Sequence, residues 1–117
     1  MTSGAGHIDA SLCQEMLAAG ILPAIELVGR RWTSAVLLAA AGGARRYGEY
    51  RARVAGISDR LLTQRLKELQ AEGLIERTVI PSTPVQIVYS PTAAALELIA
   101  ALRPLSVWGE RRLAAKP

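Results

Sequence analysis

The sequence has little of what enzymes, metal sites and secreted domains require. It contains one cysteine and one histidine in 117 residues. A single cysteine, Cys13, cannot form a disulfide within the chain, which favours a reducing cytoplasm. Because no second histidine accompanies His7, the chain is short of ligands for a metal site. We therefore expect no metal and no cofactor.

Catalysis and membrane insertion are excluded on similar grounds. A cysteine or serine nucleophile needs a positioned base, and His7 lies in an N-terminal segment of small and polar residues. No glycine-rich phosphate-binding motif is present, and Gly42-Gly43 is better explained as a helix stop. The longest apolar stretch, Ser34–Ala41, is about half of a membrane span, and no signal peptide is recognised. We expect a soluble, cytoplasmic protein that is not an enzyme and does not bind a membrane.

Positive charge is concentrated in the middle of the chain. Residues 1–29 carry three acidic residues and no lysine or arginine, whereas residues 30–77 carry ten lysines and arginines against five acidic residues. The net charge of the whole chain is +4. A basic surface suits contacts with phosphate groups, although so small an excess is also common in proteins that bind no nucleic acid.

The most informative segment is residues 57–77. Leu62, Leu66 and Leu69 recur at helical spacing and Gly73 ends the run, so the segment predicts a helix with one buried face. The other face carries polar and basic side chains that suit a major groove, where arginine or lysine pairs with guanine and glutamine with adenine. This predicts a DNA-recognition helix whose candidate contacts are Ser58, Asp59, Arg60, Thr63, Gln64 and Lys67. An ordinary amphipathic helix with a solvated charged face is the alternative.

The remaining elements follow from periodicity, glycines and prolines. We predict a helix capped by Asp9 or Ser11 that ends at 18 or 19, and helices over 23–28, 31–41 and 47–54. The helix over 47–54 and the recognition helix, joined by a turn at Gly56, form a helix-turn-helix. Residues 74–80 and 85–89 predict two strands, and Pro81-Ser-Thr-Pro84 predicts the exposed tip of the hairpin, a wing.

A long helix is predicted from Pro91-Thr92 onward, with Pro104 as a kink. Its apolar stripe is too large for so small a core, so we expect it to pack against a second copy of the protein; the stripe comprises Leu96, Ile99, Leu102, Leu105 and Trp108. The predicted fold is mainly α with a two-stranded β-wing. It is a single winged helix-turn-helix domain over 9–117, with dimerisation helices at 9–28 and 92–116 and a disordered tail at 1–8.

Basic and polar residues outside the recognition helix are candidate contacts with the DNA backbone. Arg45 and Arg46 begin a helix, where backbone N–H groups favour anions, so they are predicted phosphate contacts or, alternatively, a solvated loop pair. Arg77 and Gln86 flank the wing tip and are expected to approach the backbone or minor groove. Arg65 flanks the buried face and is expected to pair with an acidic neighbour or a phosphate. Trp32 is expected to anchor the core rather than bind a ligand.

Several motifs together resemble the HxlR family of bacterial winged helix-turn-helix regulators. They are Cys13, Gly29–Thr33, Arg46–Tyr50, Ile57-Ser58, Leu62–Leu69, Glu72–Arg77, Val88–Ser90 and Trp108-Gly109. The resemblance implies a homodimer whose two recognition helices enter successive major grooves of a palindromic operator. It implies a transcriptional regulator; a repressor is favoured, and the residues leave open whether binding represses or activates transcription. The chain departs from the family pattern at Gln14, where a proline is common, at residues 91–95, and in having no phenylalanine.

Two residues are candidates for sensing a signal. Some members of the family use a cysteine near Cys13 as a redox or electrophile sensor, but a plain buried thiol is favoured, because the first 29 residues contain no lysine, no arginine and no histidine except His7. A small-molecule effector could bind in an apolar space beside Trp108 in a dimer. The second hypothesis for the whole protein is a ligand-binding or protein-interaction module that keeps the winged-helix fold without DNA binding. Such a module is expected to lose the basic and amide side chains that remain at Arg60, Gln64 and Lys67.

Overall fold

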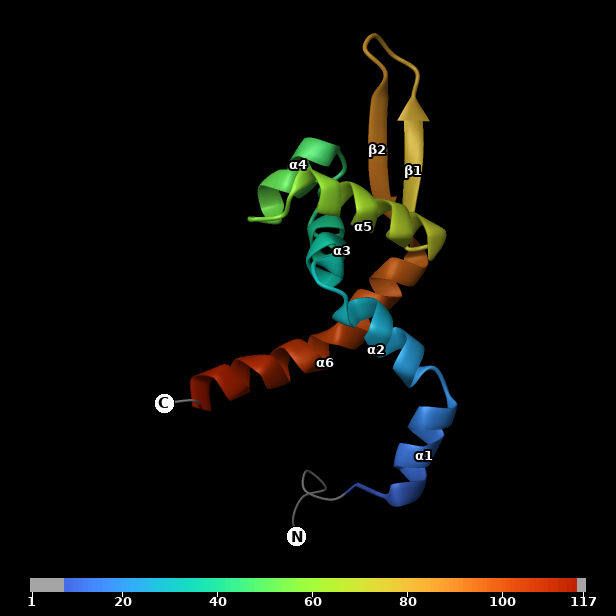
Figure 1. Cartoon of the computed structure of the whole chain (residues 1–117), viewed down its shortest axis with the longest axis vertical. Coiled ribbons are helices and arrows are strands. Elements are labelled where there is room, and N and C mark those ends of the chain that lie inside the picture. Colours follow the sequence, from blue (N-terminus) through green and yellow to red (C-terminus); the bar gives the residue numbers. More distant parts are fainter. Residues whose placement is uncertain (1–7, 116–117) are drawn as a thin grey trace. The chain divides into compact units, whose positions relative to one another are not determined.

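The computed structural model describes residues 8–115, so the predicted disordered tail over 1–8 lies outside the described residues except for Ile8. In the described part, six helices and one two-stranded antiparallel sheet follow in the order α1, α2, α3, α4, α5, β1, β2 and α6 (Figure 1). The predicted fold class, mainly α with a two-stranded wing, is confirmed. The chain divides into two compact units, one up to Arg31 and one from Trp32 onward.

The first unit contains helices α1 (Ala10–Ala18) and α2 (Ile21–Gly29). Asp9 caps α1 as predicted, since its carboxylate accepts a hydrogen bond of 3.0 Å from the Ser11 N–H, and this bond lowers the pKa of Asp9. Helix α2 begins at Ile21, before the predicted start at Pro23. Proline is tolerated there because the first N–H groups of a helix have no partner within the helix.

No single helix among residues 8–115 is long and apolar enough to cross a membrane. The bent pair formed by α1 and α2, with 69° between its halves, meets the requirement by length and composition alone.

The second unit is built around helix α3 (Thr33–Ala41), in which Val36, Leu37 and Ala40 are completely buried. The helix begins at Thr33 rather than near residue 31, because Trp32 has a φ of +77°. That left-handed conformation cannot continue into a right-handed helix. Gly42 follows the last residue of the helix, as the predicted helix stop requires.

Helices α4 (Tyr47–Arg53) and α5 (Asp59–Ala71) form the helix-turn-helix. The turn between them includes Gly56 at a φ of +88°, a conformation that glycine adopts without strain. Ser58 caps α5 by accepting a 3.1 Å hydrogen bond from the Leu61 N–H. Gly73, at a φ of +74°, allows the chain to leave α5 and enter the wing.

Helix α5 packs against the rest of the second unit through its leucine face. Leu62, Leu66 and Leu69 are at most 2% exposed, as their spacing predicts. Burying each of these side chains contributes about 1.5–3 kcal/mol to folding. The helix contacts α3 and α4 on one side of the molecule and β1 at its end. Its buried stripe therefore fixes which face of α5 remains in solvent.

Strands β1 (Ile75–Ile80) and β2 (Gln86–Pro91) pair antiparallel, from Ile75 opposite Pro91 to Ile80 opposite Gln86. The hairpin projects away from α3, α4 and α5 (Figure 1). Its tip is exposed, as the two prolines predict, and the Ser82 hydroxyl donates a 2.7 Å hydrogen bond to the Pro84 carbonyl across it. The predicted wing is confirmed.

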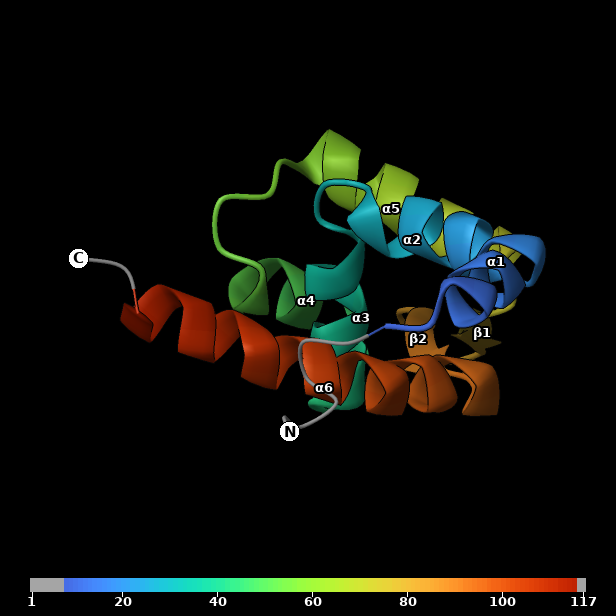
Figure 2. The same cartoon turned by 90° about the horizontal axis from the view of Figure 1, so that it is seen from below.

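Helix α6 (Ala93–Ala115) is one continuous helix that contains Pro104. Thr92 precedes it and joins it to the end of α5, because its hydroxyl donates to the Gly73 carbonyl at 2.7 Å and accepts from the Ala95 N–H. The helix contacts α3 and β2, and its C-terminal half extends beyond them (Figure 2). Within the second unit, Leu105 and Trp108 are 57% and 53% exposed.

Candidate nucleic-acid interface

The outer face of α5 carries the base-contact candidates. Arg60, Thr63, Gln64 and Lys67 are all exposed, on the side of the helix away from its buried leucines. Two of these side chains are cationic, one is an amide and one a hydroxyl, and all of them can pair with base edges or phosphates. The structure thus brings four predicted contact residues together on one accessible helix face.

The first turn of α5 carries the other two candidates, and both are engaged within the protein. The Ser58 hydroxyl accepts the capping hydrogen bond described above. The Asp59 carboxylate forms an ion pair with Arg51, with 3.0 Å between Nε and Oδ1. The Tyr47 hydroxyl donates to the Asp59 backbone carbonyl at 3.0 Å and lies 3.2 Å from the same Oδ1. Asp59 therefore has partners from α4 before any DNA is bound.

Helix α4 connects α5 to the wing through two pairs of side chains spaced four residues apart. Arg46, just before the helix, and Tyr50 reach strand β2, whereas Tyr47 and Arg51 reach the start of α5. Residues four apart lie on the same side of a helix, so each pair contacts one neighbouring element. Helix α4 therefore fixes the recognition helix and the wing relative to each other.

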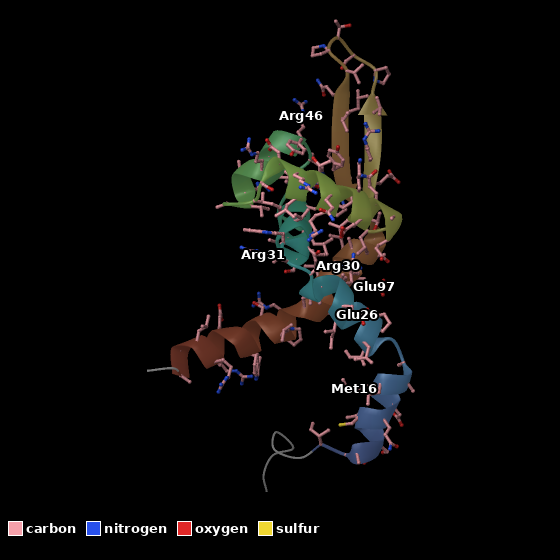
Figure 3. All side chains as sticks on the ribbon, viewed as in Figure 1. Met16, Glu26, Arg30, Arg31, Arg46 and Glu97 are labelled. Atoms are coloured by element: carbon pink, nitrogen blue, oxygen red, sulfur yellow. The ribbon has the colours of Figure 1, made fainter. Side chains whose placement is uncertain are left out.

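The contact of Arg46 with the wing joins two predicted DNA-binding residues. Its Nη2 donates a 2.8 Å hydrogen bond to Oε1 of Gln86, although the two residues are forty positions apart in the sequence. The Arg46 side chain points from the start of α4 toward the wing (Figure 3). Arg46 is exposed, so its cationic group is accessible at the junction of α4 and β2.

Tyr50 makes the second contact with the wing, and this one is buried. Its hydroxyl donates a 2.7 Å hydrogen bond to the Tyr89 carbonyl, and the two rings meet edge to face with centroids 6.2 Å apart. Burial raises the pKa of Tyr50 to about 12, because the phenolate would lose its hydration. Tyr50 therefore stays a hydrogen-bond donor at neutral pH and holds β2 in place.

Arg45 is placed differently from Arg46. Its Nη1 donates hydrogen bonds of 2.8 and 2.7 Å to the carbonyls of Ala40 and Ala44. These are carbonyls of the last turn of α3 and of the loop that follows it. Its own carbonyl accepts a 2.7 Å hydrogen bond from the Tyr89 N–H. Arg45 is half-buried and has a structural role that the sequence did not indicate. Its contact with phosphate stays a prediction.

The start of α4 already holds an anion from the protein itself. The Glu49 carboxylate accepts hydrogen bonds from the backbone N–H groups of Arg46 and Arg45, at 3.1 and 2.9 Å, and these bonds lower the pKa of Glu49. The positive end of α4 that was predicted to favour phosphate is thus occupied by Glu49. A phosphate group would have to compete with Glu49 for these two N–H groups.

The wing candidates lie on different faces of the hairpin. Arg77 is opposite Tyr89, and Gln86 is opposite Ile80. Since directly opposed residues share a face and neighbours along a strand alternate, Arg77 and Gln86 point to opposite faces. Their expected joint approach to the DNA backbone stays a prediction. Arg65 pairs with Glu68 at 3.0 Å, which confirms the predicted acidic neighbour.

Three residues of this region were not predicted from the sequence as functional: Tyr47, Glu49 and Arg51. Tyr47 is half-buried, with its hydroxyl at the start of α5. The available signal was the repeat of polar-tipped residues four apart over residues 46–51. That spacing shows shared faces but not which neighbouring element each face meets.

The two sensor candidates belong to different units. Cys13 is exposed on α1 and borders a shallow apolar cavity of about 320 Å³ within the first unit, together with Met16, Leu17, Ile21, Leu22 and Ile25. The predicted buried thiol is therefore not found in this unit, where Cys13 is exposed. Trp108 lies on α6 in the second unit, where it is also exposed.

Comparison with known proteins agrees with this geometry. A family model described as HxlR-like helix-turn-helix matches residues 27–117. The chain belongs to the HxlR family. The resemblance noted from the motifs is thus confirmed, and with it a helix-turn-helix regulator of transcription that binds DNA.

Two proteins of Bacillus subtilis are similar to this chain in sequence. The HTH-type transcriptional regulator YvaP is 38% identical over 85 residues, which cover 73% of this chain and 79% of YvaP. The HTH-type transcriptional regulator YodB is 32% identical over 88 residues, which cover 75% of this chain and 79% of YodB. These relatives are named as regulators and not as enzymes, which supports the exclusion of catalysis at the level of the family.

Solved structures of HxlR-like regulators share the fold. The reduced form of YodB matches with a TM-score of 0.72 and 31% identity, over 78% of this chain and 89% of YodB. The redox regulator HypR in its oxidised form matches with a TM-score of 0.71 and 27% identity, over 80% of this chain and 96% of HypR.

Proposed function

We propose that this HxlR protein is a sequence-specific repressor that binds a palindromic operator as a homodimer. Helix α5 enters the major groove, where Arg60 and Gln64 contact base edges and Thr63 and Lys67 contact bases or phosphates. The observation that carries the proposal is the division of α5 into a leucine face that is buried and a basic, amide-bearing face that is fully accessible. The same accessible face argues against a module that has lost DNA binding.

Backbone contacts are assigned to residues of the wing and to Arg46, which reaches it from α4. Arg46 is exposed where α4 meets β2, and its hydrogen bond to Gln86 orients both side chains. Arg77 is exposed on β1. Contacts of this kind position a protein on the duplex but carry little sequence information. Arg45 makes the smallest contribution of the group, because its guanidinium already serves the end of α3.

The homodimer is supported by apolar side chains that each unit leaves exposed. In α6 they are Leu96, Leu105, Val107, Trp108 and Leu113, and in the first unit they are Leu12, Met16, Leu17, Leu22 and Ile25. Exposed apolar surfaces of this extent mark interaction sites in soluble proteins. A twofold dimer would place two α5 helices in successive major grooves, about 34 Å apart along the duplex.

The proposal is tested by selection of binding sites from a library of random duplexes with the purified full chain. A repeated, inverted half-site is expected to be enriched, and its affinity is expected to fall steeply as salt rises, because phosphate contacts release counterions. Transcription from a promoter that carries the enriched site is expected to fall when the protein is present. Failure to enrich any sequence over the starting library would overturn the proposal.

A response to thiol oxidants or quinones is a second function, favoured by the exposed Cys13 beside an apolar cavity. Solved structures of YodB include diamide-treated and quinone-bound forms. Diamide is expected to change operator affinity of the wild type but not of Cys13→Ser. An equal response of both proteins, or none in either, would remove Cys13 from sensing.

A further inference from the structure

The Tyr47 side chain of α4 has three polar contacts with the recognition helix. Its hydroxyl donates to the Asp59 carbonyl at 3.0 Å and lies 3.2 Å from the Asp59 carboxylate and 3.4 Å from the Thr63 hydroxyl. Asp59 and Thr63 are four residues apart and so share one side of the first turns of α5. One hydroxyl of α4 therefore meets two candidate DNA contacts.

The contact with Thr63 affects which group of that side chain, the hydroxyl or the methyl, faces a DNA groove. A threonine in a helix divides between two side-chain rotamers, because its hydroxyl has alternative partners. The hydroxyl can bond to a base or phosphate, whereas the methyl group suits the methyl of thymine. A neighbour that bonds the hydroxyl favours one rotamer. The 3.4 Å contact with the Tyr47 hydroxyl therefore favours one of the two Thr63 rotamers.

The contact with Asp59 bears on charge at the same place. A carboxylate at the start of a recognition helix would repel phosphates. Arg51 and Tyr47 both meet the same carboxylate oxygen of Asp59, at 3.0 and 3.2 Å. Their contacts turn Asp59 toward α4 and compensate its charge, although both partners of the ion pair remain largely exposed. Asp59 thus behaves as a link between α4 and α5 and not as a free acceptor for a cytosine amino group.

We propose that Tyr47 is a specificity-determining positioning residue, which sets the base preference of α5 through Asp59 and Thr63 without contacting a base itself. Arg51 supports it through Asp59. This inference rests on the proposed function, because it assigns a role within DNA recognition by α5. Tyr47 would thus differ from the residues that contact bases, because it would act only by orienting their side chains.

The test compares the sites selected by wild type and Tyr47→Phe from the same library of random duplexes. The phenylalanine ring keeps the packing and removes only the hydroxyl. We expect the base preference to broaden at the pairs that face the first turns of α5. Operator affinity is expected to fall by about two- to tenfold, the effect of one net hydrogen bond, with affinity for random DNA unchanged.

Two further variants show whether Tyr47 acts through its partners. In the Asp59→Ala background, Tyr47→Phe is expected to reduce operator affinity by a smaller factor than in the wild type. The reason is that the Asp59 carboxylate, one of the groups that the Tyr47 hydroxyl contacts, is already absent. Arg51→Gln is expected to broaden preference at the same base pairs. Arg111→Gln, which removes an exposed arginine of α6, is the matched control for loss of charge and is expected to leave the selected sequence unchanged.

The outcomes that contradict the inference are distinct from one another. If Tyr47→Phe selects the wild-type sequence with wild-type affinity, the hydroxyl does not position the reading face. If it weakens operator and random DNA by the same factor, Tyr47 is a phosphate contact. If wild type itself enriches no sequence, the proposed function fails and this inference fails with it. Thermal melting of each variant confirms that the compared proteins are folded.

Discussion

The buried contact between α4 and the wing predicts a specific loss of stability in Tyr50→Phe. Tyr50 is completely buried, and its hydroxyl is 2.7 Å from the Tyr89 carbonyl. The substitution keeps the ring and its edge-to-face contact but leaves that carbonyl without this donor. A buried group that loses its partner costs about 1–3 kcal/mol. For a chain of 117 residues, each kcal/mol lowers the melting temperature by about 4 °C.

The raised pKa of Tyr50 predicts how this loss of stability depends on pH. The folded protein raises the pKa of Tyr50 to about 12, above the value of about 10 for an unperturbed tyrosine. The stabilisation linked to the protonated hydroxyl is therefore complete below about pH 10. It is lost as the pH rises through about 12, because the unfolded chain ionises first. A difference of about two pKa units corresponds to roughly 2–3 kcal/mol.

Urea unfolding of wild type and Tyr50→Phe across this pH range measures both effects. The difference in the free energy of unfolding is expected to be largest near neutral pH and to narrow above about pH 10, since the variant has no phenol to ionise at this position. Equal stability of the two proteins at neutral pH would refute the reasoning. So would a difference that stays constant through alkaline pH.

Three other substitutions test separate parts of the account. Ser58→Ala removes the cap of α5 and is expected to lower the free energy of unfolding by about 0.5–2 kcal/mol, with Ser58→Thr as the control that keeps an acceptor; an unchanged urea midpoint would contradict the capping role. Arg77→Ala is expected to weaken operator and random DNA by similar factors and to lower the salt slope by about one in a titration at several salt concentrations; a loss confined to the operator would make Arg77 a base contact. Leu105→Asp places a charge in the exposed stripe of α6 and is expected to convert a dimer to monomers in sedimentation at micromolar concentration; an unchanged dimer would move the interface elsewhere.

The sequence predicted the elements well wherever one local signal decided the outcome. The leucines of α5 and the serine that caps it define that helix with no help from distant residues, and the two prolines define the exposed tip of the wing. The start of α3 was misplaced because Trp32 adopts a left-handed conformation that is rare outside glycine, so no pattern of side chains predicts it.

The partners of polar side chains were harder to predict than their exposure. The outward position of Arg60 and Gln64 follows from helical periodicity alone. In contrast, Arg45 and Arg46 are adjacent and chemically identical, yet one serves the end of α3 and the other reaches Gln86. Such assignments depend on where α3 and β2 come to lie, which is a property of the assembled fold. The same applies to the hydroxyl of Tyr47.

Recognition of specific bases by the outer face of α5 is best measured as the ratio of operator to random-DNA affinity in Arg60→Ala and Gln64→Ala. Each substitution is expected to remove about 1–3 kcal/mol of discrimination for a lost bidentate base contact and to relax preference at one base pair of each half-site. Glu97→Ala, on the exposed surface of α6, controls for an unrelated change of side chain. Wild-type discrimination in both α5 variants would contradict the claim.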